Sequence, residues 1–123
     1  PKRDDVISLG FVTDEEKFSL IKDCKTLVLA SEFESLSMAV LEAMTYNRPV
    51  LVNGKCKVLR GHCVKSNAGL YFENYFEFEG ALNYMLTNSE GYARLCEGGS
   101  GYVDKNYRWD VIIKKVETLL ACL

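Results

Sequence analysis

Short apolar runs alternate with amphipathic runs along most of the chain. Runs rich in β-branched and aromatic residues predict four strands. The first lies in the run at 5–12 and ends at Gly10, and the others lie at 25–30, 49–53 and 69–73. Apolar residues at helical spacing predict helices at 13–24, 38–46, 74–86, 90–99 and 106–120. This alternation is typical of a parallel sheet with helices on both faces, so we predict one Rossmann-like α/β domain over residues 1–123.

Capping residues mark two of the predicted helix starts. Thr13 has Glu16 three residues later, which is the spacing of a capping box, and Asn74 with Glu77 caps another helix. One apolar face consists of Phe78, Ala81, Leu82, Met85 and Leu86. The last helix has a second apolar stripe, which we interpret as core packing and which consists of Trp109, Ile112, Ile113, Val116 and Leu120.

The segment between the third and fourth strands is predicted to be a loop, because it contains Gly54 and Gly61. Its basic residues are Lys55, Lys57 and Arg60. Two interpretations stay open: a solvated loop, or a contact to an anionic acceptor or to a second lobe. His62 is the single histidine of the chain, and we expect it at the surface of this loop.

Composition narrows the class of protein. A net charge of -2 and a pI of about 5.5 argue against a nucleic-acid-binding surface. No apolar run approaches the ~20 residues that span a bilayer, and the charged start PKRDD lacks a signal-peptide pattern. The five cysteines show no close C-x-x-C pair, which favours reduced thiols over a metal site. We therefore expect a cytoplasmic protein.

Ligands of parallel α/β sheets bind outside the carboxyl ends of the strands. This rule directs attention to the turn after Gly10 and to the loops after Ala30 and Asn53. The loop at 31–37, SEFESLS, is the most informative, because small polar residues let the backbone approach a ligand. The helix that follows begins with unpaired N–H groups and a partial positive charge, and both suit a diphosphate.

Two carboxylates bracket the same turn. If the helix begins near Ser37, Glu42 lies about 7–8 Å along its axis, while Glu34 precedes it in the loop. A carboxylate can accept hydrogen bonds from two hydroxyls, so each glutamate suits one sugar of a nucleotide-sugar. The alternative is an ordinary helix glutamate at 42 and plain loop charges at Glu32 and Glu34.

The stretch 33–53, FESLSMAVLEAMTYNRPVLVN, resembles the donor-site motif of family 4 (group 1) GT-B glycosyltransferases. That motif reads Glu-Gly-Phe-Gly-Leu-x-x-x-Glu-Ala-Met, a small turn, then Pro-Val-Val. The matching residues are Glu34, Glu42, Ala43, Met44, Pro49 and Val50. Segments 9–31, 73–86 and 105–120 resemble the flanking elements, so the resemblance covers nearly the whole chain. It implies a partial C-terminal, donor-binding lobe of a GT-B fold.

The resemblance also implies an activity, which is transfer of a sugar from a nucleotide-sugar donor to an acceptor with retention of configuration. Glu34 would be the catalytic residue, binding donor-sugar hydroxyls near the reacting centre. The other implied donor-binding groups are backbone N–H groups at Ser35, Leu36, Ser37 and Met38, the Glu42 carboxylate for the ribose, and main chain at Phe11 and Val12 beside the base. The leaving diphosphate would help to deprotonate the acceptor. No metal and no cofactor is expected.

Two departures from the family motif keep other functions open. Ser35 and Ser37 replace glycines, and serine is disfavoured wherever the backbone needs a positive φ. The segment after the third strand also lacks the usual Gly-Gly-x-x-Glu pattern. One alternative is a non-catalytic nucleotide-binding or assembly module on the same fold. Another is a different GT-B enzyme, such as a phosphorylase or a sugar-nucleotide epimerase.

A full lobe of this type would have about six strands, whereas the pattern predicts four. The phosphate-binding Arg and Lys of the family and the amino-terminal acceptor lobe have no counterpart in the sequence. We expect the missing lobe to be a partner, the chain alone to be inactive as a transferase, and the chain alone to be marginally stable or self-associated. Relatives act at the inner membrane face on lipid-linked acceptors, so a peripheral location there is a second expectation.

Overall fold

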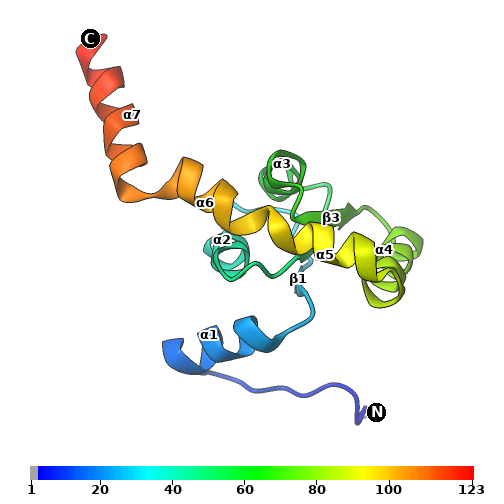
Figure 1. The fold of residues 1–123 in the computed structure, drawn as a ribbon. Coiled ribbons are helices and arrows are strands. Elements are labelled where there is room, and N and C mark those ends of the chain that lie inside the picture. The colour runs from blue at the N-terminus through cyan, green and yellow to red at the C-terminus, as the bar shows by residue number, and fades with distance from the viewer. Residues whose placement is uncertain (1–2) are drawn as a thin grey trace.

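The computed structural model describes residues 3–123, and its centre is a three-stranded parallel sheet (Figure 1). The strands are β1 (Leu27–Leu29), β2 (Val50–Asn53) and β3 (Gly69–Phe72), in that order across the sheet. Val50 pairs with Leu27 on one side and with Gly69 on the other. β2 is therefore the central strand, and the predicted Rossmann-like α/β fold class is confirmed.

The described part of the chain contains seven helices, and the last of them projects away from the sheet (Figure 1). They are α1 (Asp14–Asp23), α2 (Met38–Thr45), α3 (Lys57–Ser66), α4 (Tyr75–Thr87), α5 (Ser89–Glu97), α6 (Gly99–Tyr107) and α7 (Trp109–Ala121). Helix α6 packs against both α2 and α3, and α4 packs against β3. Among residues 3–123, no helix has the length and apolar character needed to cross a bilayer.

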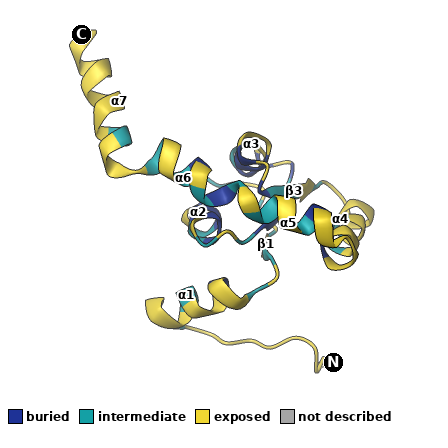
Figure 2. Cartoon of the chain, viewed as in Figure 1, coloured by how far each residue is buried: buried dark blue, intermediate teal, exposed yellow. Residues whose placement is uncertain are grey.

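The core lies between the central strand and the helices that connect the strands. Val50, Leu51 and Val52 of β2 are completely buried, and Val40 and Met44 of α2 are buried with them. Figure 2 shows buried residues on α2, α3 and α6 and mostly exposed residues on α1 and α7. Each buried side chain of this size contributes about 1.5–3 kcal/mol relative to an exposed one, so the β2–α2 unit carries much of the stability.

Both predicted helix caps are confirmed. The Thr13 hydroxyl accepts a hydrogen bond from the Glu16 N–H at 3.1 Å, and the Glu16 carboxylate accepts one from the Thr13 N–H at 3.2 Å. At α4, the Asn74 side chain accepts a hydrogen bond from the Glu77 N–H at 2.9 Å. These reciprocal bonds satisfy amides that have no partner inside the helix, which fixes where α1 and α4 begin.

The predicted strand at 5–12 is wrong. The segment forms no strand, and its side chains Ile7 and Phe11 are 79% and 106% exposed. Figure 1 shows it running past α1, away from the sheet. A strand requires a neighbour to pair its N–H and C=O groups, and no described strand lies beside this segment. The run of strand-forming residues is present in the sequence, but the described sheet has three strands and not four.

The predicted loop between β2 and β3 is also wrong, because residues 57–66 form α3. The buried face of α3 consists of Leu59, His62, Cys63 and Ser66, which are three to four residues apart. Of these four residues only Leu59 is strongly apolar, so the sequence does not show the periodic apolar pattern that is typical of a helix. The helix ends at Asn67, whose φ of 55° lies in the left-handed region typical of helix ends.

The expected core packing of the last helix is wrong as well. Residues 106 and 107 belong to α6, and α7 has no buried residue. Trp109, Ile113, Val116 and Leu120 are between 48% and 78% exposed, and Figure 2 shows α7 projecting from the body of the molecule. Arg108, with φ -70° and ψ 146°, breaks the helix and turns α7 away from the core. On α4, Met85 is buried but Leu86 is exposed.

Candidate functional site

The loop at 31–37 lies at the carboxyl edge of the sheet, as predicted, between the end of β1 and the start of α2. Asn53, the last residue of β2, joins the neighbouring strand ends. Its side-chain NH2 donates to the Ala30 carbonyl at 3.0 Å, and its side-chain oxygen accepts from the Lys55 N–H at 2.9 Å. These bonds position the loops after β1 and β2 beside each other at one edge of the sheet.

Ser37 begins α2 in a left-handed backbone conformation, with φ 65° and ψ 83°. Its side chain makes no capping hydrogen bond, so the first-turn amides of α2 have no side-chain partner. Of the two serines that replace family glycines, Ser37 is the one at a position with positive φ, whereas Ser35 is not. The helix start therefore presents backbone N–H groups beside an energetically strained turn.

His62 is buried and not at the surface, which corrects the sequence-based expectation. It is 4% exposed on α3, and its Nε2 lies 2.8 Å from the Leu36 carbonyl oxygen. Its Nδ1 lies 2.7 Å from the hydroxyl of Tyr102, which is on α6. Burial raises the pKa of Tyr102 above its usual range, so this hydroxyl remains protonated. His62 thus links the loop before α2 to two helices.

Glu34 lies in a surface hollow of about 560 Å³. The hollow is lined by Glu32, Phe33, Glu34, Ser35, Lys55, Cys56, Lys57 and Val58. Glu34 is half-buried there, and the two lysines come from the start of α3 and the residues before it. The acidic loop and the basic segment after β2 therefore face each other across one cavity, which has room for a sugar ring and polar groups of both signs.

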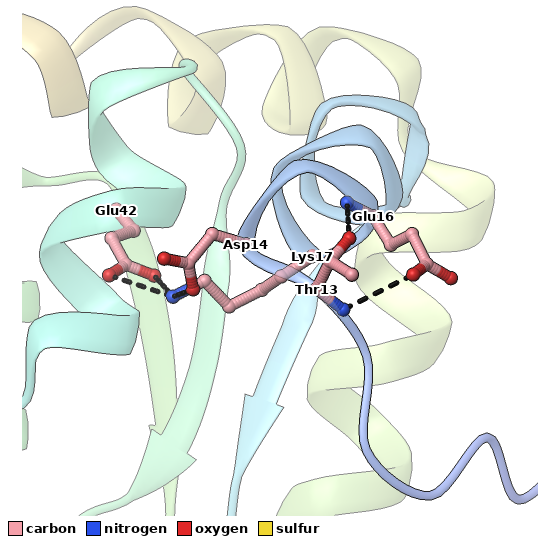
Figure 3. Close-up of polar contacts among 5 residues, drawn as sticks. All are labelled: Thr13, Asp14, Glu16, Lys17 and Glu42. Atoms are coloured by element: carbon pink, nitrogen blue, oxygen red, sulfur yellow. Dashed lines mark hydrogen bonds and ion pairs between the residues drawn. The ribbon is translucent and has the colours of Figure 1, made fainter.

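Glu42 faces α1 and not the hollow that contains Glu34. Its side chain is 20% exposed, and each of its carboxylate oxygens lies 3.4 Å from the Lys17 ammonium (Figure 3). Lys17 also lies 3.7 Å from Asp14, so it bridges one carboxylate on its own helix and one on α2. The sequence analysis did not single out Lys17, because no local motif relates positions 17 and 42.

The remaining predicted site residues are spread over neighbouring surfaces. Leu36 is 38% exposed and Met38 is 61% exposed, both beside the start of α2. Phe11 and Val12 line a separate hollow of about 440 Å³ against α1. Within residues 3–123, a larger hollow of about 640 Å³ lies elsewhere, between α3 and α5. The structure thus brings Glu34 and Ser35 into one cavity and places Glu42 and Phe11 outside it.

The chain is therefore a Rossmann-like α/β domain with a parallel sheet and, at the carboxyl edge of that sheet, a helix start that has no side-chain cap. The model of the family described as "Glycosyl transferases group 1" matches residues 2–101. The chain therefore belongs to the group 1 glycosyltransferase family. The description of that family names glycosyl transfer as the activity of the family.

One curated relative shows what share of a longer protein this chain corresponds to. The chain is 27% identical over 123 residues to the Glycosyltransferase 1 domain-containing protein 1 of Xenopus tropicalis. The match covers 98% of this chain and 34% of that protein, so the chain spans about a third of the length of this relative. No solved structure matches the chain.

Proposed function

We propose that this chain is the donor-binding part of a retaining glycosyltransferase of the GT-B class, with a nucleotide-sugar as donor. The observation that carries the proposal is the start of α2 at Ser37, whose first-turn amides have no side-chain cap. Glu34 precedes this start and Glu42 follows it on the side facing α1. A diphosphate bound at the amides would lie between two carboxylates, each available to one sugar.

The diphosphate is the ligand group that this helix start suits best. Unpaired N–H groups and the helix dipole together favour an anion, and we propose that the left-handed turn at Ser37 directs successive amides toward it. In our proposal the backbone N–H groups of residues 35–38 bind the diphosphate and the sugar attached to it. These donors would stabilise the charge that develops on the diphosphate as it leaves.

Glu42 is proposed to bind the ribose hydroxyls of the donor. In the free protein its partner is Lys17, but the two 3.4 Å contacts are longer than the 2.7–2.9 Å of strong charge-assisted hydrogen bonds. Ribose hydroxyls could therefore replace Lys17 at little cost. Main chain at Phe11 and Val12 is proposed to border the base, since both residues adjoin the start of α1.

Glu34 is the proposed catalytic residue, which binds donor-sugar hydroxyls next to the reacting carbon. In the proposed reaction, the bond from the anomeric carbon to the diphosphate oxygen breaks. The acceptor oxygen bonds to the same face of that carbon, and the acceptor proton passes to the diphosphate. Neither a metal nor a cofactor is part of this proposal. The lysines in the Glu34 hollow would suit an anionic acceptor.

The proposed partner is an acceptor-binding lobe carried by a longer protein, in keeping with the length of the curated relative. An acceptor must reach the anomeric carbon from outside the donor site, and the hollow that contains Glu34 opens to the surface. We therefore propose that the chain alone binds donors but does not transfer sugar, and that the longer protein acts in the cytoplasm or at the inner membrane face.

Titration with UDP-, GDP- and ADP-sugars by calorimetry tests the donor site. Wild type should bind at least one of them, and Glu42→Ala should weaken that binding by at least about tenfold, because charged hydrogen bonds contribute ~1.5–3 kcal/mol. Glu117→Ala on the exposed face of α7 is the matched control and should bind like wild type. If Glu42→Ala binds the donor as tightly as wild type does, the ribose does not bind at Glu42.

The second candidate is a nucleotide-binding module without catalytic activity. Ser37 favours it, because a serine with φ 65° makes the turn costlier to hold than the family glycine would. The two candidates differ in one readout, which is sugar transfer by the longer protein. Transfer that is lost in Glu34→Gln supports the enzyme, whereas donor binding without any transfer supports the module.

A further inference from the structure

We propose that His62 and Tyr102 act as positioning residues that hold the turn at Ser37 in its ligand-binding shape. The pair reaches this turn through the carbonyl of Leu36, the residue directly before Ser37. The proposed effect on nucleotide binding rests on the function proposed above, whereas the effect on the turn itself does not.

The donor and the acceptor of each hydrogen bond between Leu36, His62 and Tyr102 can be assigned. The Leu36 carbonyl can only accept, so the His62 Nε2 at 2.8 Å must carry the proton. In a neutral ring Nδ1 is then an acceptor, and the Tyr102 hydroxyl donates to it at 2.7 Å. The Tyr107 hydroxyl lies 3.4 Å from that of Tyr102 and extends the chain weakly. The bonds therefore run from α6 through α3 to the loop.

Burial makes these bonds persistent. His62 is 4% exposed and Tyr102 is 8% exposed, so their hydrogen bonds are largely shielded from water. The His62 ring also packs edge-on against the rings of Tyr102 and Tyr107, with centroids 5.7 Å apart in both cases. The imidazole is therefore held in one orientation, with Nε2 directed at the loop.

The orientation of the His62 ring affects the backbone conformation at Ser37. A left-handed backbone costs a residue with a side chain roughly 1–2 kcal/mol, and Ser37 makes no capping bond that would offset it. The Leu36 carbonyl and the Ser37 N–H belong to the same peptide unit. Because the peptide is trans, they point in opposite directions. A carbonyl held inward by His62 therefore directs the Ser37 N–H outward, toward the proposed diphosphate position.

Two substitutions separate positioning from simple packing. In His62→Gln the side-chain amide nitrogen lies near the original Nε2 and can still donate to the Leu36 carbonyl, but the Tyr102 contact is lost. In His62→Asn the shorter amide can reach Tyr102 but not Leu36. If His62 only fastened α3 to α6, Asn would be the milder change. If it positions the turn, Gln is the milder one.

Amide hydrogen exchange of the 123-residue chain measures how stable the turn at Ser37 is when no ligand is present. The reporter is the Leu41 N–H, which donates to the Ser37 carbonyl at 3.4 Å. We expect at least about tenfold faster exchange in His62→Asn and a smaller change in His62→Gln, with thermal melts showing that both fold. Equal exchange in the two variants, or faster exchange in Gln, would overturn the proposal. The ¹⁵N shifts of His62 must also show the Nε2–H tautomer.

Binding of UDP, GDP and ADP provides the functional readout. The affinity for the nucleotide that binds wild type should fall about tenfold in His62→Asn and less in His62→Gln. Tyr102→Phe should weaken binding more than Tyr107→Phe, the matched control. Binding that is lost in Glu42→Ala but unchanged in all His62 and Tyr102 variants overturns the positioning role. If wild type binds none of the three, the proposed function fails, and the exchange experiment still decides the positioning role.

Adding Ser37→Gly to His62→Asn tests the link to backbone strain. Glycine adopts a positive φ without a Cβ clash, so the turn would depend less on His62. We expect the double variant to recover part of the slow Leu41 exchange that His62→Asn loses. A double variant that exchanges as fast as His62→Asn would contradict the idea that the pair offsets strain at Ser37.

Discussion

Ser37 combines a left-handed backbone with a side chain that gains no hydrogen bond from it. Residues with a Cβ adopt this conformation at a cost, and the family motif has glycine at the corresponding position. The side chain is 8% exposed, so it fits the packing even though the backbone is strained. The strained residue is thus located at the helix start that the proposed function uses.

Replacing Ser37 with glycine should stabilise the chain. Glycine removes the cost of the positive φ but has more entropy in the unfolded chain, so we expect a net gain of about 0.5–1 kcal/mol in the free energy of unfolding. Chemical denaturation measures it. Ser35→Gly is the matched control, since Ser35 lacks a positive φ, and it should be neutral or destabilising. A loss of stability in Ser37→Gly would refute the strain at this position.

The sequence identified Ser37, Glu34 and Glu42 as residues of interest but not the contacts they make. His62 and Lys17 were missed because their partners are 26 and 25 residues away and lie on other elements. The structure shows that Cys56 and Cys63 are buried, and burial raises the pKa of Cys63 to about 12. Residue type and spacing therefore predict the element in which a residue lies better than they predict the residues that it contacts.

At the scale of elements, the packing of α6 on α2 supports the site from behind. Gly99 at the start of α6 lies against the backbone of Met44 on α2. A Cβ at Gly99 would approach the Met44 carbonyl oxygen to 2.7 Å, closer than side-chain carbons come in folded proteins. The same helix carries Tyr102, so the position of α6 also sets the position of the His62 contact.

Gly99→Ala should therefore destabilise the chain by about 1–3 kcal/mol, because the two backbones must separate. Gly101→Ala on the same helix is the matched control, since a Cβ there meets no atom within 4 Å. The control should be neutral or stabilising, because alanine is the better helix former. Thermal melts of both variants provide the comparison. Equal behaviour of the two would contradict the close α2–α6 contact.

Element prediction succeeded where hydrophobic periodicity and caps agreed. The helices at α1, α2 and α4 and the strands β1, β2 and β3 were predicted within a few residues. Helix α3 was missed because Gly54 and Gly61 suggested a loop and because its buried face includes the polar residues His62 and Ser66. The partners of the His62 ring lie on other elements. The helical character of α7 was predicted correctly, but its burial was not, since periodicity does not show what covers an apolar stripe.

At the scale of the whole molecule, large apolar side chains are exposed at several places, and the segment before α1 and helix α7 are two of them. Ile7, Leu9 and Phe11 are exposed before α1, and Trp109 and Leu119 are exposed on α7. The body between them has a well-buried core around β2 (Figure 2). Extended apolar surface of this kind is typical of regions that contact another protein surface.

The isolated chain should therefore self-associate as its concentration rises. Sedimentation velocity from low to high micromolar concentration should show an increasing mean sedimentation coefficient. Replacing Ile113 and Leu120 of α7 with serine should reduce the increase without lowering the melting temperature, since α7 has no buried residue. A wild-type chain that stays monomeric over the whole range would contradict the prediction.

The fold class could be predicted from the sequence because alternation of strands and helices restricts the topology strongly. The number of paired strands could not, because the segment at 5–12 has a strand pattern but no neighbour among the described strands. The carboxyl edge of the sheet was predicted as the location of the site by the same topological rule. The position of Glu42, facing Lys17, depends on how α1 packs and was not predictable from spacing.

We propose above all that the start of α2 binds a diphosphate between Glu34 and Glu42. A crystal structure of the chain soaked with the nucleoside diphosphate that binds it most tightly tests this most directly. We expect diphosphate oxygens within hydrogen-bonding distance of the backbone amides at 35–38, with the ribose bound to Glu42 and Lys17 displaced from that carboxylate. A nucleotide bound in the hollow between α3 and α5, with the start of α2 unoccupied, would contradict it.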